Sequence, residues 1–84
     1  MEAFIYFYSN SGQALDVFED ALGEVLGDEG EVTGTGSGAT GSNFDVEVFE
    51  GDARRFLDQF REALKREGAP KDAVIVIEGE RYPL

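Results

Sequence analysis

The chain has 84 residues, a length that forms one domain around a single core. It carries 18 Asp and Glu against 7 Lys and Arg, a formal net charge of −11, and it contains no His and no Cys. Without Cys the chain has no disulfides and no thiolate chemistry, and without His it lacks the commonest metal ligand and general base. Its 42% hydrophobic and 30% charged residues are typical of a globular protein.

The charge is divided unevenly along the chain. Residues 1–53 carry twelve acidic side chains and no Lys or Arg, a formal charge of −12, whereas residues 54–84 hold all seven basic side chains and six acidic ones. Because most nucleotide, phosphate and nucleic-acid sites need a cation, we expect no nucleic-acid partner. The acidity has two open interpretations, which are an acidic surface that meets a basic partner and adaptation to a salt-rich or high-GC source.

The start of the chain lacks the features of a signal peptide, since MEAFIYFYSNSG contains no Lys or Arg and its apolar run is short. No stretch of the sequence approaches the length and hydrophobicity of a membrane span. We therefore expect a cytoplasmic protein that has no membrane partner.

A strand followed by a helix is predicted over the first third of the chain. Residues 3–8 (AFIYFY) are almost all aromatic or aliphatic, which is typical of a strand that is apolar on both faces. The polar stretch after them supplies the N-cap of a helix, either Asn10 in a capping box with Gln13 or Ser11. Apolar residues then recur at helical spacing over residues 15–26, namely Leu15, Phe18, Leu22, Val25 and Leu26.

Two further strands are predicted on either side of a glycine-rich segment. Residues 31–35 form one strand, and residues 44–48 form the other, in which apolar and acidic residues alternate. The segment GTGSGATGSN has two interpretations. It is a flexible hairpin tip, or it extends the strand with Gly34, Gly36 and Gly38 leaving one face bare, which permits close approach by another element or by a partner.

A second helix and a last strand complete the pattern. The helix covers residues 53–64, begins at Asp52 as its cap, and presents a continuous apolar stripe before Gly68 ends it. Residues 73–77 (AVIVI) form the last strand, and a polar tail that contains Tyr82 follows.

The resulting order of elements, β-α-β-β-α-β, predicts a single α+β domain over residues 1–84. With right-handed crossovers this order gives the ferredoxin-like fold, a four-stranded antiparallel sheet in the order 4-1-3-2 with both helices on one face.

The glycine-rich segment resembles a nucleotide motif only by letter. Residues 36–41 (GSGATG) fit G-x-G-x-x-G, but a dinucleotide site needs a helix after the motif, so that the pyrophosphate meets the helix N-terminus. Here the strand NFDVEV follows, and Ser42 stands where a P-loop needs Lys. We therefore expect no nucleotide cofactor.

The acidic residues do not form a recognisable metal or catalytic site. Asp28, Glu29 and Glu31 lack the order of a Ca²⁺-binding loop. Asp45 and Glu47 point the same way, as a glycosidase pair does, but they lie on an open strand with no pocket that would raise one pKa. We expect a protein without metal, cofactor or enzymatic activity.

The aromatic residues of the first strand give the clearest sign of a binding surface. This strand lies in the middle of the predicted sheet, and two helices on one side cannot cover both of its faces. Because Tyr keeps its hydroxyl in water, we assign Phe4, Tyr6 and Tyr8 to the open face, beside one apolar row of the last strand and bordered by Asp45 and Glu47. A basic flank is absent, so we expect this patch to bind protein and not RNA.

In its size, its charge and residues 31–49 (EVTGTGSGATGSNFDVEVF), the chain resembles small acidic bacterial proteins of the immunity or inhibitor kind, many of them uncharacterised. The resemblance implies a protein that blocks a toxin or a nucleic-acid-handling enzyme by presenting carboxylates to its basic site.

The leading hypothesis is a non-enzymatic binding protein that uses carboxylates and the open sheet face, and the alternative is a domain that dimerises through that face. Asp16, Glu19 and Asp20 on the first helix lie opposite the sheet pair Asp45 and Glu47. We favour the sheet pair as the partner site, because aromatic neighbours add desolvated anchors to electrostatic steering.

Overall fold

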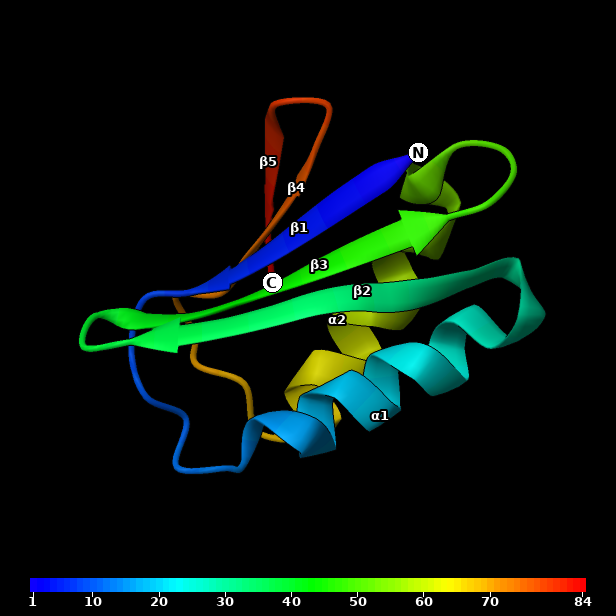
Figure 1. Ribbon diagram of the computed structural model, residues 1–84. Coiled ribbons are helices and arrows are strands. Elements are labelled where there is room, and N and C mark those ends of the chain that lie inside the picture. The colour runs from blue at the N-terminus through cyan, green and yellow to red at the C-terminus, as the bar shows by residue number, and fades with distance from the viewer.

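Five antiparallel strands form one sheet in the computed structural model, which describes residues 1–84 (Figure 1). The strands are β1 (Glu2–Phe7), β2 (Gly30–Gly38), β3 (Gly41–Val48), β4 (Val74–Ile77) and β5 (Glu80–Pro83). Their order in the sheet is β2-β3-β1-β4-β5, so the predicted order of the first four strands is confirmed. The fold is α+β, and the prediction of only four strands is wrong.

Two helices cover one face of this sheet (Figure 1). They are α1 (Leu15–Leu26), which runs into the 3-10 turn η1 (Gly27–Glu29), and α2 (Leu57–Arg66), which is preceded by the 3-10 turn η2 (Ala53–Phe56). Neither helix is long and apolar enough to cross a membrane.

The fifth strand replaces the polar tail that the sequence predicts. Glu78 and Gly79 both have positive φ, 51° and 79°, as a two-residue type I′ hairpin turn requires. The chain therefore reverses after β4 and pairs with it, placing Tyr82 opposite Ile75 and Arg81 opposite Val76.

The glycine-rich segment is mostly strand and only briefly a hairpin tip, which favours the second of the two interpretations. Residues 39 and 40 alone separate β2 from β3. At Gly41 the φ of 147° suits glycine, and a Cβ there would overlap the carbonyl oxygen of Phe7 on β1. As the sequence predicts, a strand follows the G-x-G-x-x-G match.

The predicted caps of the two helices have different outcomes. Asp52 accepts a hydrogen bond from the Arg54 N–H at 2.9 Å, so its capping role is confirmed. The caps predicted for α1 are wrong, because Asn10 accepts from the Gly12 N–H and Ser11 from the Gln13 N–H, each closing a local turn ahead of the helix. α1 begins after Ala14 without a side-chain cap.

The core lies between the two helices and the sheet. From β1 it receives Ala3, Ile5 and Phe7, which alternate with less buried residues. The Phe7 ring meets Phe18 of α1 and Phe44 of β3 edge-on, at centroid distances of 4.9 and 5.3 Å. No polar or charged residue is buried, so the core is held by apolar packing alone.

At Gly30, the first residue of β2, the backbone of β3 and the side chain of Leu26 on α1 approach so closely that only glycine fits. A Cβ at Gly30 would overlap the carbonyl oxygen of Glu47 and lie 2.9 Å from Leu26 Cδ2. Gly23, in contrast, is exposed in the middle of α1 and would present its Cβ to open space. Packing therefore requires glycine at position 30 but not at position 23.

We expect Gly30→Ala to destabilise the protein by about 1–3 kcal/mol through overpacking. Gly23→Ala should stabilise it by about 0.5–1 kcal/mol, because alanine loses less backbone entropy in a helix. Urea unfolding of both variants measures the difference. Equal effects at the two positions would contradict the packing described for Gly30.

Candidate protein-binding face of the sheet

The face of the sheet away from the helices carries the aromatic row of β1. Phe4 and Tyr6 are half-buried and Tyr8, which follows the strand, is 50% exposed. The Tyr6 and Tyr8 rings are stacked, with centroids 6.4 Å apart and planes at 20°. The predicted assignment of these three residues to the open face is confirmed.

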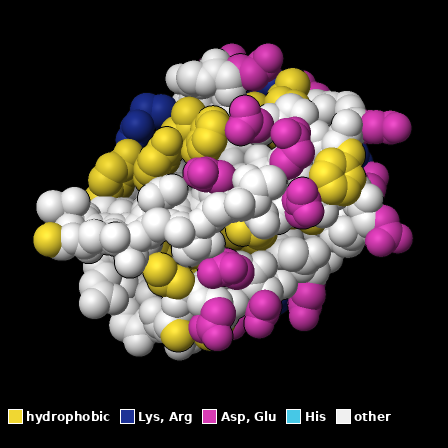
Figure 2. All heavy atoms as spheres, in the orientation of Figure 1, with side chains coloured by type: hydrophobic (Ala, Val, Ile, Leu, Met, Phe, Trp, Pro, Cys, Tyr) yellow, Lys and Arg dark blue, Asp and Glu magenta, His cyan; other side chains and the backbone are white.

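Strand β4 extends this row into a patch. Val76 pairs with Phe4 and Val74 pairs with Tyr6, and both valines face away from the helices, since Ile75 is the buried residue between them. We call Phe4, Tyr6, Tyr8, Val74 and Val76 the open-face patch. Figure 2 shows hydrophobic side chains gathered on this side of the molecule, with acidic side chains next to them. A hollow of about 400 Å³ beside the two tyrosines reaches the β2–β3 hairpin.

One flank of the patch is acidic, as the sequence predicts. Asp45 pairs with Phe4 across β3 and β1, so its carboxylate borders the patch directly. It accepts a hydrogen bond from Asn43 Nδ2 at 3.3 Å. Glu47 lies two pairs further along the same face, opposite Glu2, and its Oε2 accepts from the Met1 ammonium at 2.9 Å. Asp45 is therefore the more available of the two predicted carboxylates.

Bare backbone lies beside these polar side chains on β2. Gly34 pairs with Asp45 and Gly36 with Asn43. A Cβ at Gly34 would lie 3.2 Å from Asp45 Oδ2, and a Cβ at Gly36 would lie 2.7 Å from Asn43 Oδ1. The side chains of β3 thus lean over the glycines, toward the edge of the sheet.

The other flank of the patch is basic at one position. Arg81 of β5 donates to the Tyr8 hydroxyl at 3.2 Å, and its guanidinium carbon lies 5.9 Å from the centre of the Tyr8 ring. The prediction that the patch has no basic flank is therefore wrong at this one residue. The sequence signal for this hairpin is Gly79 alone, between AVIVI and Arg81, because Glu78 lacks the preference for positive φ that Asn or Asp has in such a turn.

The acidic residues of α1 lie on the opposite side of the sheet from Asp45, as the sequence predicts. Asp16 and Asp20 are exposed, and Glu19 is partly covered. None of the three forms an ion pair. These carboxylates have no exposed aromatic side chain beside them. Substitutions at these positions therefore serve as controls for substitutions that change the charge of the open sheet face.

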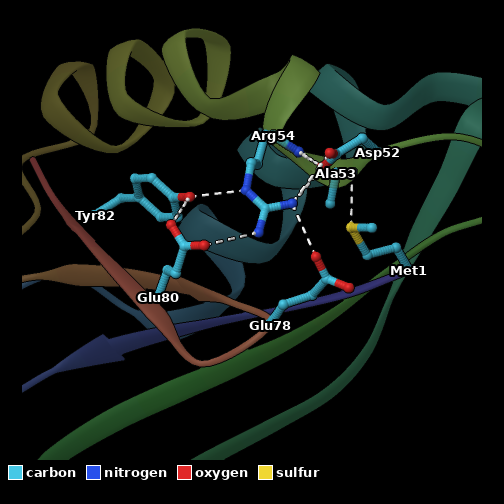
Figure 3. Close-up of polar contacts among 7 residues, drawn as sticks. All are labelled: Met1, Asp52, Ala53, Arg54, Glu78, Glu80 and Tyr82. Carbon is cyan, nitrogen blue, oxygen red and sulfur yellow. Dashed lines mark hydrogen bonds and ion pairs between the residues drawn. The ribbon is translucent and has the colours of Figure 1, made fainter.

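The densest group of polar contacts surrounds Arg54, at the start of η2 (Figure 3). Its Nη1 lies 3.0 Å from both Asp52 Oδ1 and Glu78 Oε1, and its Nε donates to the Tyr82 hydroxyl at 2.8 Å. Tyr82 in turn donates to Glu80 Oε2 at 2.9 Å. These contacts fasten the β4–β5 hairpin to the beginning of the second helical segment.

The same contacts shift two pKa values. The hydrogen bond to the Tyr82 hydroxyl, followed by those to Glu78 and Asp52, raises the pKa of Arg54 above its ordinary value. The backbone N–H of Arg54 is the main cause that lowers the pKa of Asp52, and the guanidinium adds to it. Because the groups satisfy one another, we interpret the cluster as structural and not as a ligand site.

No family model, curated protein or solved structure matches this chain. No group of three or more His, Cys, Asp or Glu side chains could hold a metal ion. Function is therefore inferred from the chemistry of the surface itself.

We expect Asp52→Asn to be less stable than the wild type at pH 7, although asparagine keeps an oxygen for the cap. Folding lowers the pKa of Asp52, so its charge stabilises the native state at neutral pH. This contribution is lost as the pH falls below about 4 and through the lowered pKa, so the difference between the two proteins should shrink there.

Urea midpoints at pH 7 and at about pH 3 measure this difference. Asp58→Asn serves as the control, because Asp58 is 98% exposed and meets Arg61 only at 3.7 Å. A difference between wild type and Asp52→Asn that stays constant with pH would show that the charge of Asp52 does not stabilise the fold.

Proposed function

We propose that this chain is a non-enzymatic acidic binding protein whose open-face patch docks a basic surface of another protein. The observation that carries the proposal is the arrangement on the uncovered sheet face, where Phe4, Tyr6 and Tyr8 lie directly beside the carboxylate of Asp45. Tyrosine and other aromatic side chains are enriched in the centres of protein interfaces, and charged side chains such as that of Asp45 are typical of the polar rim around such a centre.

Charge and aromatic residues would have separate roles in this interaction. A net charge of −11 attracts a basic partner over a distance of about one Debye length, roughly 8 Å at physiological salt. Once the surfaces meet, Tyr6 and Tyr8 supply large, stiff contact area, and the hollow beside them can take a side chain of the partner. Association should therefore be fast and sensitive to salt.

The partner class that fits this chemistry is a toxin or a nucleic-acid-handling enzyme with a basic site, as for proteins of the immunity or inhibitor kind. We also propose that β1–β4 with α1 and α2 form a ferredoxin-like core, to which β5 is added at the β4 edge. A cytoplasmic location is part of the same proposal.

Self-association is a second candidate function, and Arg81 is the observation that favours it. The patch has Asp45 on one flank and Arg81 on the other. A two-fold axis through Tyr6 would bring Arg81 of each copy toward Asp45 of the other, as an isologous interface requires. The alternative is therefore a homodimer that buries the open-face patch.

Tyr8→Ala and Asp45→Lys should each weaken binding of the basic partner, once a pull-down with the wild-type protein has identified it. We expect a loss of about tenfold or more for Tyr8→Ala, through faster dissociation, and slower association for Asp45→Lys. Asp20→Lys on α1 makes the same charge change away from the patch and is the control. A larger effect of Asp20→Lys would move the site to α1, and equal small effects would favour salt adaptation as the origin of the acidity.

The dimer makes a different prediction, which sedimentation of the protein alone can test. A monomer–dimer equilibrium should appear at high protein concentration and disappear in Tyr6→Glu and in Arg81→Glu. A strict monomer that neither substitution changes would eliminate the second candidate.

A further inference from the structure

The outer edge of β2 is an unpaired strand edge. β2 is the first strand of the sheet, paired only with β3 (Figure 1). From Gly34 the pairing runs without interruption to Gly38, after an irregularity between Val32 and Gly34. Outside the β2–β3 ladder, no backbone group of residues 34–38 takes part in a hydrogen bond. Within these five residues of regular strand, the residues that alternate with those bonded to β3 therefore present free N–H and C=O groups to an incoming chain.

The usual protections of a strand edge are missing here. Residues 34–38 contain no Pro and no charged side chain, and Thr35, Ser37 and Gly38 are exposed. The irregularity ahead of Gly34 is the only feature that would blunt the edge, and it leaves these five residues regular. An extended segment could thus pair with them directly.

The glycines also give such a segment access to negative charge. A side chain on an added strand beside Gly34 would meet no side chain on β2 itself. It would lie about one strand spacing, roughly 4.8 Å, from the position where the Asp45 carboxylate leans over Gly34. Glu31, on the same face of β2 because it pairs with Glu47, adds a second carboxylate near this edge.

We propose that residues 34–38 bind an extended basic segment of a protein partner as a sixth strand of the sheet. Main-chain hydrogen bonds to β2 supply affinity, and alternate Arg or Lys side chains of the segment lie across Gly34 and Gly36 toward Asp45. The inference rests on the proposed function in taking a basic protein as the partner. Its surface is the edge of β2, which shares Asp45 with the flank of the open-face patch but none of the patch residues.

Charge complementarity decides between a basic segment and a second copy of this chain. Residues 1–53, which include this edge, have a formal charge of −12. Two copies paired through β2 would bring Asp45 and Glu31 of one chain toward the same carboxylates of the other, and like charges that close destabilise strand pairing. A basic segment meets the same groups with opposite charge.

A nine-residue peptide of alternating Arg and Thr is the probe. We expect it to bind the intact protein with a Kd below about 1 mM and to slow amide exchange of residues 34–38. The matched control is the same peptide methylated on its backbone nitrogens, which keeps every charge but cannot pair as a strand. Asp45→Asn should weaken binding of the unmodified peptide several-fold, and Asp20→Asn should not.

Two comparisons separate this inference from the proposed function. Tyr8→Ala removes part of the open-face patch and should leave peptide binding unchanged if the edge is the site. Three results would each overturn the sixth-strand proposal. The methylated peptide could bind as tightly as the unmodified one, or the peptide could slow amide exchange in β1 and β4 in place of residues 34–38. The third such result is a peptide that does not bind with a Kd below about 1 mM. The open-face proposal would then still stand on its own test with Tyr8→Ala and the protein partner.

Discussion

Strand β1 is apolar on both of its faces, and the fold has helices on only one side of it. On the helix side, Ala3, Ile5 and Phe7 are buried in the core. Phe4 and Tyr6 are left on the open side, where only the neighbouring strands cover them in part. An aromatic row that the domain itself does not bury is costly to expose to water, so its presence in the central strand needs an explanation outside the core.

The uneven charge of the chain has a structural counterpart. Most of the arginines in residues 54–84 make contacts within the fold. Arg54 forms an ion pair with Glu78 in the turn between β4 and β5, and Arg55 forms one with Glu29 at 2.8 Å, which links the two halves of the chain. The acidic residues of the first half have few such partners. Most of the negative charge therefore stays at the surface, where it can act on other molecules.

Much of the fold follows from local patterns, and the remainder depends on contacts that such patterns do not contain. The helical spacing of apolar residues in α1 and the continuous β-branched run of β4 are strong local signals, so those elements could be predicted. The sequence does not predict strand β5, because its turn places Glu78, a residue without special preference for positive φ, next to Gly79. The lean of Asp45 over Gly34 depends on strand register, which is set by pairing over the whole sheet.

The central claim is that the aromatic row of β1 is retained for contacts outside the domain and not for its stability. Replacing Ile5 and Tyr6 in turn by threonine tests it most directly, because both variants place the same strand-favouring residue at adjacent positions. We expect Ile5→Thr to lower the free energy of unfolding by about 2–4 kcal/mol and Tyr6→Thr by no more than about 1 kcal/mol. An equally large loss at both positions would mean that the open face belongs to the stabilising core, and would contradict the account.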